Sequence, residues 1–383
     1  MLALAPHIIL PMEFVLPQGE ASRPAWLLRA GMFLYDHLGG CKRLPPSRAL
    51  RLDRHPIGEG LRPGITRALV YSDCLVDDSR LVCLTALDAA ERGDTILTRT
   101  RLVAAERDAT GWCATVESRR GRVELHAKVL VNAAGPWVDE VLDTLHGAHR
   151  TSAVRLVKGS HIVVPRLYAG EHAFLMQNPD RRVVFAIPYE ERFTLVGTTD
   201  VPWTGRPARA RISDAEIDYL CATLTRYFKQ PAARQAVMWS FAGIRPLVDD
   251  HAGSASAGTR DYTLELDTAD GGAAILSIFG GKITPHRKLA EHALEKLSPF
   301  FHALGPAWTA AAPLPRGATF RAATSPLSSP SSPPSGRNFR GRFCTSWSER
   351  TARARQFCWA MLAGPRSWGE TAADIFIRRK SST

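Results

Sequence analysis

The sequence lacks the features that mark a secreted, disulfide-bonded or membrane-spanning protein. Its seven cysteines form no CxxC pair and no even framework, which is typical of reduced thiols and not of disulfides or metal ligands. No apolar run reaches the roughly 18–20 residues that a membrane-spanning helix needs. The N-terminus has no basic segment and is interrupted by Pro6, which argues against a secretory signal. We therefore expect a cytoplasmic protein that binds no metal.

The chain has little excess of positive charge over most of its length, although the net charge is +12. Residues 318–383 hold eleven Arg or Lys and three Asp or Glu, which is +8 of that total, and the first 317 residues hold the remaining +4. Binding to nucleic acid is therefore not expected. The Ser/Pro-rich stretch 325–336 cannot form a packed core. We expect residues 301–383 to be a linker and an atypical basic tail, either a flexible linker or an aberrant, out-of-register segment.

The remaining composition is that of a globular protein, with 45% hydrophobic and 22% charged residues over 383 positions. The hydrophobic pattern predicts a mixed α/β (α+β) fold. Residues 1–75 are expected to be helical or irregular, and 146–265 to form an antiparallel sheet inserted between two pieces of one α/β domain, 76–145 and 266–300. The expected helices are 25–38, 78–92, 138–145, 213–228 and 288–296, with a strand at 95–100 and a hairpin of 111–117 with 122–126.

The helix expected at 25–38 is apolar over much of its surface. Burial in the core and contact with a membrane surface both explain that pattern.

The most informative segment is the apolar run that ends in Gly280 and Gly281, followed by Lys282, Ile283 and Thr284. Glycines at the start of a helix expose backbone N–H groups and let a planar ligand approach. Lys282 would place a positive charge beside such a ligand. A tight strand-to-helix connection with no ligand remains an alternative.

Three other parts of the sequence place small, polar or charged residues beside expected apolar strands. The small residues 133–136 before Trp137 allow close approach to a flat ligand, or form an ordinary turn. His161 is expected at the head of an apolar strand, where it is either a structural residue or a base. Arg245 and Arg260 need anionic partners, which a ligand or Asp249, Asp250 and Asp261 could supply. If they converge, the three cations Arg245, Arg260 and Lys282 with the His161 base suit a phosphorylated alcohol.

Nine ordered segments resemble the FAD-dependent, membrane-associated glycerol-3-phosphate dehydrogenase family, and the likeness covers about residues 6–316. The segments are YSDCLVDDSRLV (71–82), LTRTR (97–101), VNAAGPWV (131–138), LVKGSHIVVPR (156–166), VGTTD (196–200), GIRPL (243–247), TRDYTL (259–264), FGGKIT (279–284) and RKLAEHALEKL (287–297).

The resemblance implies an amino-acid-oxidase-like fold, in which 76–145 and 266–300 bind FAD and 146–265 binds substrate. The implied reaction oxidises sn-glycerol 3-phosphate to dihydroxyacetone phosphate and passes electrons to quinone. His161 would be the base, Arg245 and Lys282 would stabilise charge at the reacting oxygen, and Arg260 would hold the phosphate. The implied flavin contacts are Arg101, Leu102, Ala134, Gly135, Pro136, Trp137, Gly280, Gly281, Lys282, Ile283 and Thr284.

The resemblance also implies peripheral contact with the inner face of the cell membrane, and a homodimer is one assembly to test. The chain departs from the family because it has no GxGxxG unit for the FAD diphosphate; Pro63 excludes the nearest glycine string, 58–64, from a helix start. About five hydrogen bonds to charged oxygens, each worth roughly 1.5–3 kcal/mol, would be missing. We therefore expect an incomplete Rossmann-like domain, weak FAD binding and feeble or no activity.

Two other functions are consistent with the sequence. One is a non-catalytic remnant that binds anions or an anionic membrane surface through the basic tail. The other is a related FAD-dependent oxidase of an amine or a hydroxy acid, against which the three cations argue.

Overall fold

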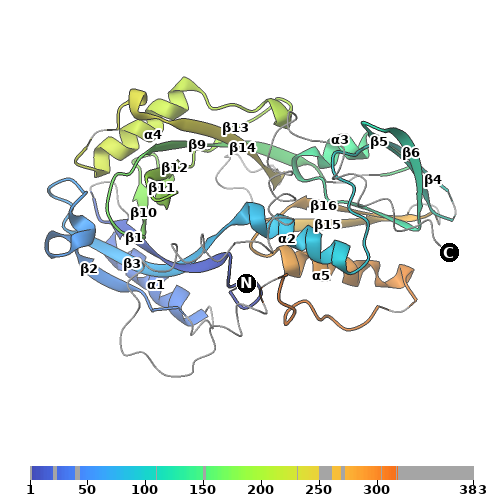
Figure 1. Cartoon of the computed structure of the whole chain (residues 1–383), viewed down its shortest axis with the longest axis horizontal. Helices are drawn as coiled ribbons and strands as arrows, with labels where there is room; N and C mark the ends of the chain where they lie inside the picture. Colours follow the sequence, from blue (N-terminus) through green and yellow to red (C-terminus); the bar gives the residue numbers. More distant parts are fainter. Residues whose placement is uncertain are drawn as a thin grey trace, which may run out of the picture. The chain divides into compact units, whose positions relative to one another are not determined.

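The computed structural model describes residues 2–19, 24–38, 44–108, 110–149, 152–230, 232–249, 261–268, 272–302, 304–315 and 317 (Figure 1). The chain divides into two compact units. The larger comprises 1–4, 9–75 and 97–312, and the smaller comprises 5–8, 76–96 and 313–383. Arg260 and the basic tail 318–383 lie outside the described residues.

A nine-stranded sheet dominates the larger unit. Its neighbouring strands are antiparallel, except that β1 and β10 run parallel, in the pairs whose register the structure describes. The order is β13 (Val201–Pro202), β9 (Val154–Pro165), β12 (Phe193–Gly197), β11 (Val183–Tyr189), β10 (Ala173–Gln177), β1 (Ile9–Pro17), β3 (Arg67–Val76) and β2 (Arg48–Arg51), with β14 (Trp239–Val248) also pairing with β9.

Helix α4 (Asp214–Tyr227) covers one face of this sheet (Figure 1). It starts where the sequence predicts, because Ser213 and Glu216 form a capping box. Leu220 and Leu224 of α4 are fully buried in a cluster with Ile162 of β9. Burying a leucine side chain contributes roughly 1.5–3 kcal/mol, so this contact fixes the helix on the sheet.

Two further sheets come mainly from the segments expected to be α/β, but one of them includes β15 (Tyr262–Asp267), most of which was expected in the antiparallel sheet of 146–265. This three-stranded sheet has the order β15, β16 (Ala274–Gly280) and β7 (Val129–Asn132), and β16 is parallel to β7. A four-stranded sheet has the order β6 (Gly121–Ala127), β5 (Trp112–Ser118), β4 (Arg101–Arg107) and β8 (Leu145–His146). Trp112 joins the two sheets, because its Nε1 donates to Ala274 O at 2.9 Å from within their shared core. Helix α3 (Val138–Leu142) follows β7, and α5 (His286–Leu297) follows β16.

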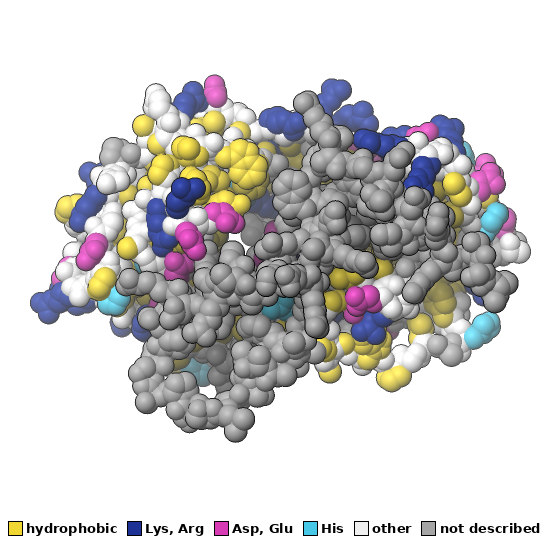
Figure 2. All heavy atoms as spheres, viewed as in Figure 1, with side chains coloured by type: hydrophobic (Ala, Val, Ile, Leu, Met, Phe, Trp, Pro, Cys, Tyr) yellow, Lys and Arg dark blue, Asp and Glu magenta, His cyan; other side chains and the backbone are white. Residues whose placement is uncertain are grey.

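The smaller unit contains α2 (Asp78–Glu91), the helix expected at 78–92. Asp77 caps it by accepting from Arg80 N, and Asp77 N donates to Ile8 O at 3.0 Å. In the ranges given above, no helix combines the length and the apolar character needed to cross a membrane. Basic and acidic side chains are interspersed over the described surface in the view of Figure 2.

Several local expectations need correction. Residues 95–100 form loop and turn and no strand, and β4 begins only at Arg101. The helix expected at 138–145 ends at Leu142, before the short strand β8. The region 1–75, expected to be helical or irregular, contributes β1, β2 and β3 to the large sheet. Tertiary pairing overrides the weak local signals in these segments.

Helix α1 (Ala25–Leu38) has the bounds that the sequence predicts, but it is not a core helix. No α1 side chain that the structure describes is buried, and Trp26 is 71% and Phe33 62% exposed. Leu28 and Met32 are half-buried, and Tyr35 holds the helix through a hydrogen bond from its hydroxyl to Ser72 O. Core burial therefore does not explain the apolar residues of α1.

Candidate active site

The structure brings two of the expected site residues, His161 and Arg245, together on adjacent strands. β9 and β14 are antiparallel, with His161 opposite Phe241, Gly159 opposite Gly243 and Val157 opposite Arg245. Side chains alternate between the faces of a strand, so His161 and Arg245 share one face with the two glycines between them. We call Gly159 and Gly243 the two-glycine floor. Since glycine has no Cβ, Gly159 leaves room for the Arg245 guanidinium, whose Nη2 would be 2.5 Å from a Cβ there, and the space over Gly243 stays open.

The Arg245 guanidinium is held by three consecutive residues that follow β12. Its Nη1 is 2.7 Å from Asp200 Oδ1 and 3.3 Å from Thr199 O, and its Nη2 donates to Thr198 Oγ1 at 2.7 Å. The side chain is still 38% exposed, which leaves it accessible to an anion. The sequence left a ligand and an ion pair as alternatives for Arg245; the structure shows an ion pair, with Asp200 and not with Asp249 or Asp261, while Asp250 lies outside the described residues.

The surroundings of the His161 ring leave it uncharged at neutral pH. The ring stacks on Phe241 with centroids 4.9 Å apart, and no described residue hydrogen-bonds to its Nδ1. Burial, and secondly the charge of Arg245, lower the pKa of His161 from 6.5 to about 4. Gly197 of β12 gives the ring its space, because a Cβ there would be 2.1 Å from His161 Cδ2. His161 lies within β9, not at the head of its strand as expected, because β9 begins at Val154.

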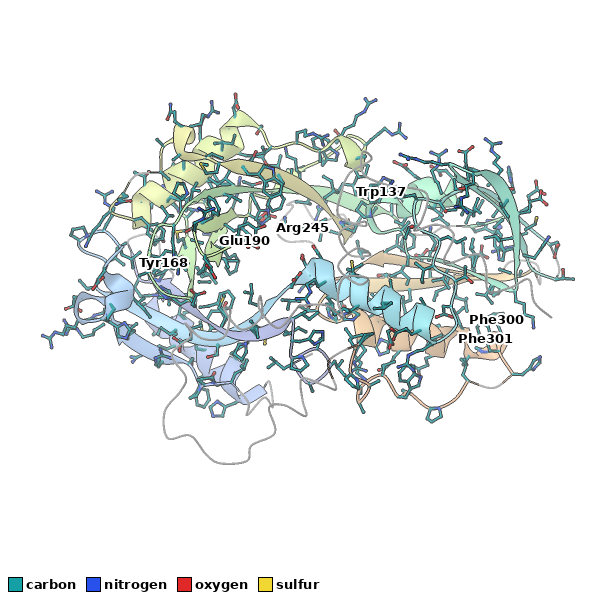
Figure 3. All side chains as sticks on the ribbon, viewed as in Figure 1. Trp137, Tyr168, Glu190, Arg245, Phe300 and Phe301 are labelled. Atoms are coloured by element: carbon teal, nitrogen blue, oxygen red, sulfur yellow. The ribbon has the colours of Figure 1, made fainter. Side chains whose placement is uncertain are left out.

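The turns expected to contact the flavin follow two parallel neighbours, β7 and β16. The carboxyl ends of parallel strands meet at the same edge of a sheet, so residues 133–137 and 281–284 lie at one edge. The first turn forms the 3-10 helix η3 (Gly135–Trp137), which contacts β14 and β16. Figure 3 labels Trp137 of η3 and Arg245 of β14. The buried Asn132 side chain shapes this turn by donating to Val138 O and accepting from Ala134 N.

Part of this edge is open, which is what a flat cofactor needs. Gly135, Gly280 and Gly281 have φ angles of 56°, 74° and 94°, and a Cβ on Gly135 would meet no atom within 4 Å. These positive φ angles favour glycine, but only the space beside Gly135 is open, since a Cβ on Gly280 would be 2.9 Å from Asp261 O and one on Gly281 would be 3.2 Å from Leu289 Cδ1. Trp137 is 42% exposed there. Ala134, Pro136, Ile283 and Thr284 complete the two turns at this edge.

Three further expected residues have different surroundings. Arg101 is exposed at the start of β4, and Leu102 packs against the core that also contains Phe279 of β16. Lys282 is exposed on the turn after β16, and in the described structure it makes no hydrogen bond or ion pair to His161 or Arg245. The end of β14 does approach this turn, because a Cβ on Gly280 would be 3.0 Å from Val248 Cγ2.

Sequence reasoning missed the residues that hold the site. Asp200 and Thr198 orient Arg245, while Gly197 and Gly159 make room for the two side chains. The string VGTTD (196–200) contains most of them. Their only sequence signal was an acid and two hydroxyls directly after an apolar strand, which does not identify the arginine that they bind.

Comparison with known proteins identifies the family of the chain. The sequence profile of the DAO family, described as FAD dependent oxidoreductase, matches residues 2–287. The chain therefore belongs to the FAD dependent oxidoreductase family, as the resemblance led us to expect, and the family's cofactor is FAD.

Several relatives within this family are similar to the chain over most of its length. The chain is 51% identical over 318 residues to a glycerol-3-phosphate dehydrogenase of Pseudomonas aeruginosa, covering 83% of this chain and 62% of that protein. It is 50% identical over 319 residues to the D-erythritol 1-phosphate dehydrogenase of Brucella abortus, with 83% and 63% covered. The structure of a Bacillus halodurans glycerol-3-phosphate dehydrogenase complexed with FAD matches with a TM-score of 0.62 at 26% identity, over 82% of this chain and 56% of that chain. The chain thus spans less than two thirds of the length of these relatives.

Proposed function

We propose that the chain carries the substrate site of a flavin-dependent dehydrogenase that oxidises sn-glycerol 3-phosphate to dihydroxyacetone phosphate, with quinone as the electron acceptor. The observation that carries the proposal is the placement of a neutral imidazole and an accessible guanidinium on one face of β9 and β14, with the guanidinium over Gly159 and open space over Gly243. A base and a cation on one face of a sheet suit a substrate that has a reacting hydroxyl and a phosphate.

His161 acts as the base. Its neutral ring accepts the proton of the C2 hydroxyl while the C2–H bond breaks and the C2–O bond becomes a carbonyl. FAD, when bound at the edge formed by 133–137 and 280–284, supplies the acceptor for the hydride from C2 and its two electrons. Phe241 fixes the plane of the His161 ring by stacking on it, so the accepting nitrogen is oriented before substrate arrives.

The cations stabilise negative charge on the substrate. Arg245 and Lys282 are assigned to the oxygen that carries charge as its proton leaves, and Arg260 to the phosphate. The exposure of Arg245 and Lys282 supports access by an anion.

Substrate binding also makes His161 a better base. Part of the depression of its pKa comes from the Arg245 charge. An anion bound at Arg245 offsets that charge, so the pKa of His161 rises when substrate is present, while burial, the larger cause, still holds it below 6.5.

D-Erythritol 1-phosphate is a second candidate substrate. The Brucella abortus relative named for that substrate is 50% identical to this chain, almost the same identity as the glycerol-3-phosphate dehydrogenase of Pseudomonas aeruginosa. Both substrates are phosphorylated polyols and need the same base and cations. A substrate panel that contains both compounds decides between them.

The proposed location is the cytoplasmic face of the cell membrane, with α1 in peripheral contact with the lipid surface. Trp26, Phe33 and Leu34 are 71%, 62% and 55% exposed, which supports an interfacial role for this helix. A homodimer is the assembly proposed for test by sedimentation.

The function is tested with the purified full chain, saturating FAD and a redox dye. We expect dye reduction that depends on sn-glycerol 3-phosphate, and a fall in kcat of at least about 100-fold for His161→Asn. Reduction with an amine or hydroxy acid in place of the phosphate would refute the substrate assignment. No turnover, combined with vesicle binding that requires residues 318–383, would instead support a non-catalytic anion-binding protein.

A further inference from the structure

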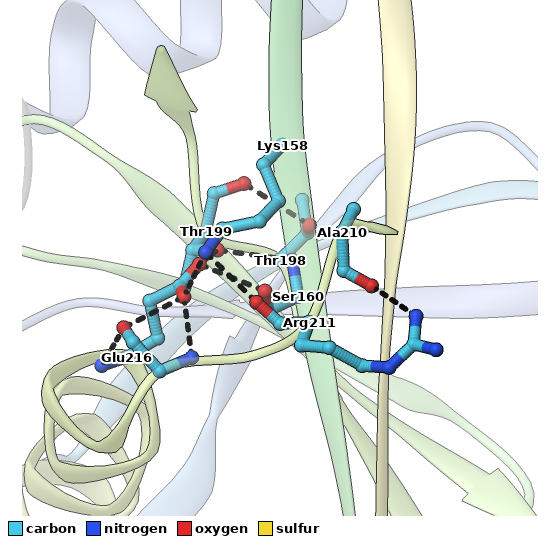
Figure 4. Close-up of polar contacts among 8 residues, drawn as sticks. Lys158, Ser160, Thr198, Thr199, Ala210, Arg211 and Glu216 are labelled. Carbon is cyan, nitrogen blue, oxygen red and sulfur yellow. Dashed lines mark hydrogen bonds and ion pairs between the residues drawn. The ribbon is translucent and has the colours of Figure 1, made fainter. Parts of the chain in front are cut away.

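A buried ion pair lies beside the site, and the proposed chemistry does not use it. Lys158 Nζ is 2.8 Å from Glu216 Oε2, and the two side chains are only 7% and 6% exposed (Figure 4). Lys158 Nζ also donates to Arg211 O at 2.9 Å. Removing two charges from water is costly, so added stability is a poor explanation for a buried ion pair. The residues that the pair holds in place explain it better.

Glu216 is the centre of a wider hydrogen-bond network. Its Oε1 accepts from Ser160 Oγ and from Thr199 Oγ1, each at 2.7 Å. Thr199 Oγ1 in turn accepts from Ser160 N at 2.9 Å, which fixes the Thr199 side chain from two sides. Burial by itself raises the pKa of Glu216, but hydrogen bonds from Lys158, Ser213, Ser160 and Thr199 outweigh it and lower the pKa to about 2. The carboxylate is therefore charged at neutral pH.

Thr199 connects this network to the arginine of the site. Thr199 O accepts from Arg245 Nη1 at 3.3 Å, and its neighbours Thr198 and Asp200 supply the other two acceptors at 2.7 Å each. On the opposite side, Gly159 gives the guanidinium its place, because a Cβ there would be 2.5 Å from Arg245 Nη2. The guanidinium thus lies between a turn that Glu216 anchors and the strand that carries Lys158.

We propose that Lys158 and Glu216 form a positioning element for Arg245: they fix residues 198–200 and thereby orient the guanidinium toward an anionic substrate. Neither residue contacts the substrate. The inference rests on the proposed function only in that Arg245 is the group that binds the anion. Preorganised donors bind an anion more tightly because they lose less freedom on binding.

The test removes one hydroxyl and leaves the buried charges paired. Thr199→Val deletes the hydrogen bond to Glu216 Oε1 and the one that Thr199 Oγ1 accepts from Ser160 N, with little change of shape, whereas Thr199→Ser keeps a hydroxyl. With the FAD-loaded full chain, we expect Thr199→Val to raise KM for sn-glycerol 3-phosphate about tenfold, with a much smaller change in kcat. Thr199→Ser should recover most of that loss.

A double-mutant cycle separates positioning from general loss of stability. In an Arg245→Gln background, Thr199→Val should raise KM no further, because the group that it positions is already gone. Tyr227→Phe is the matched control. It removes a buried hydroxyl that bonds Gln177 at the other end of α4, and it should lower stability without changing KM. Equal KM effects of Thr199→Val in both backgrounds would overturn the proposal.

A second readout does not depend on turnover. In the ¹⁵N spectrum of arginine-labelled protein, the Arg245 Nη protons should exchange slowly in the wild type and in Tyr227→Phe, and faster in Thr199→Val and Glu216→Gln. Unchanged exchange in a folded Thr199→Val variant would refute positioning, even if the wild type oxidises no phosphate. If the protein reduces no dye but the Arg245 protons still exchange faster in Thr199→Val than in the wild type, only the proposed function is refuted.

Discussion

At the scale of single residues, the site depends on what surrounds His161 and Arg245 more than on those two side chains alone. Burial and the Arg245 charge keep His161 neutral, and three acceptors hold the guanidinium while leaving one side accessible. Gly159 leaves room for the guanidinium, and the space over Gly243 stays open. A Cβ at position 159 would be 2.5 Å from Arg245 Nη2, so the guanidinium could not take this place over another residue.

The titration of His161 is the first prediction at this scale. In labelled protein, its imidazole should titrate near pH 4, and inorganic phosphate should move that pKa upward by offsetting Arg245. Because the folded pKa lies below the unfolded value of 6.5, the unfolded chain binds the proton first. The contribution of His161 to the free energy of unfolding is therefore complete above pH 6.5 and falls as the pH drops to 4. An imidazole that titrates at 6.5 or above without phosphate would contradict this.

The two-glycine floor gives a second prediction. A Cβ on Gly243 would meet no atom within 4 Å, so Gly243→Ala should leave the midpoint of urea unfolding almost unchanged. The added methyl group would nevertheless project from the face between His161 and Arg245, so we expect KM to rise about tenfold or more. Gly31→Ala on α1 is the control, since it also adds a methyl group in open space but far along the chain from the site. A Gly243→Ala variant with normal KM would show that substrate does not lie over the floor.

At the scale of elements, α1 differs from the other helices. α4 buries leucines against the large sheet, whereas α1 presents Trp26 and Phe33 to solvent although its sequence is the more apolar. A helix that attaches through Tyr35 and a half-buried stripe keeps its remaining apolar side chains available for a surface. Exposed aromatic side chains of this kind are typical of helices at a lipid interface.

Vesicle binding checks that role of α1. The double variant Trp26→Glu and Phe33→Glu should lose most of its flotation with anionic lipid vesicles, while its unfolding midpoint changes little because both side chains are exposed. Leu294→Glu, at a 50% exposed position of α5, adds a charge elsewhere and should float like the wild type. Undiminished flotation of the double variant would place the membrane contact outside α1.

At the scale of the whole molecule, the larger unit contains both the strands proposed to bind substrate and the sheet edge proposed to bind the flavin. The parallel pair β7 and β16 brings two turns to one edge, and η3 contacts both β14 and β16. These two turns are the proposed contacts to the isoalloxazine ring of the flavin. Contacts to the FAD diphosphate depend on a GxGxxG unit, which the printed sequence does not contain.

FAD retention tests the balance between these contacts. We expect the purified chain to lose most of its 450-nm absorbance on gel filtration, because about five hydrogen bonds to the diphosphate, each roughly 1.5–3 kcal/mol, are missing. Dye reduction should then require added FAD and saturate with it. A stoichiometric yellow complex that survives the column would show that the ring contacts suffice.

Much of the local structure could be predicted because its causes are local. The helix 25–38, the hairpin around 119–121, the capped helix after Ser213 and the buried strand before Gly280 all follow from periodicity and capping over a few residues. The site residues His161 and Arg245 were found from their unusual place in apolar segments, and the structure places them on adjacent strands. Arg260 lies outside the described residues, so its part in the site stays a prediction.

The sequence by itself determined the class of the protein and the chemistry of its polar groups, since both are written in short ordered strings such as LVKGSHIVVPR and FGGKIT. Only the tertiary structure decided that β1, β2 and β3 join the large sheet, that Arg245 pairs with Asp200, and that Gly159 faces Gly243. The physical reason is that strand partners and register depend on contacts between residues far apart in the chain, where a shift of one residue would turn every side chain to the other face.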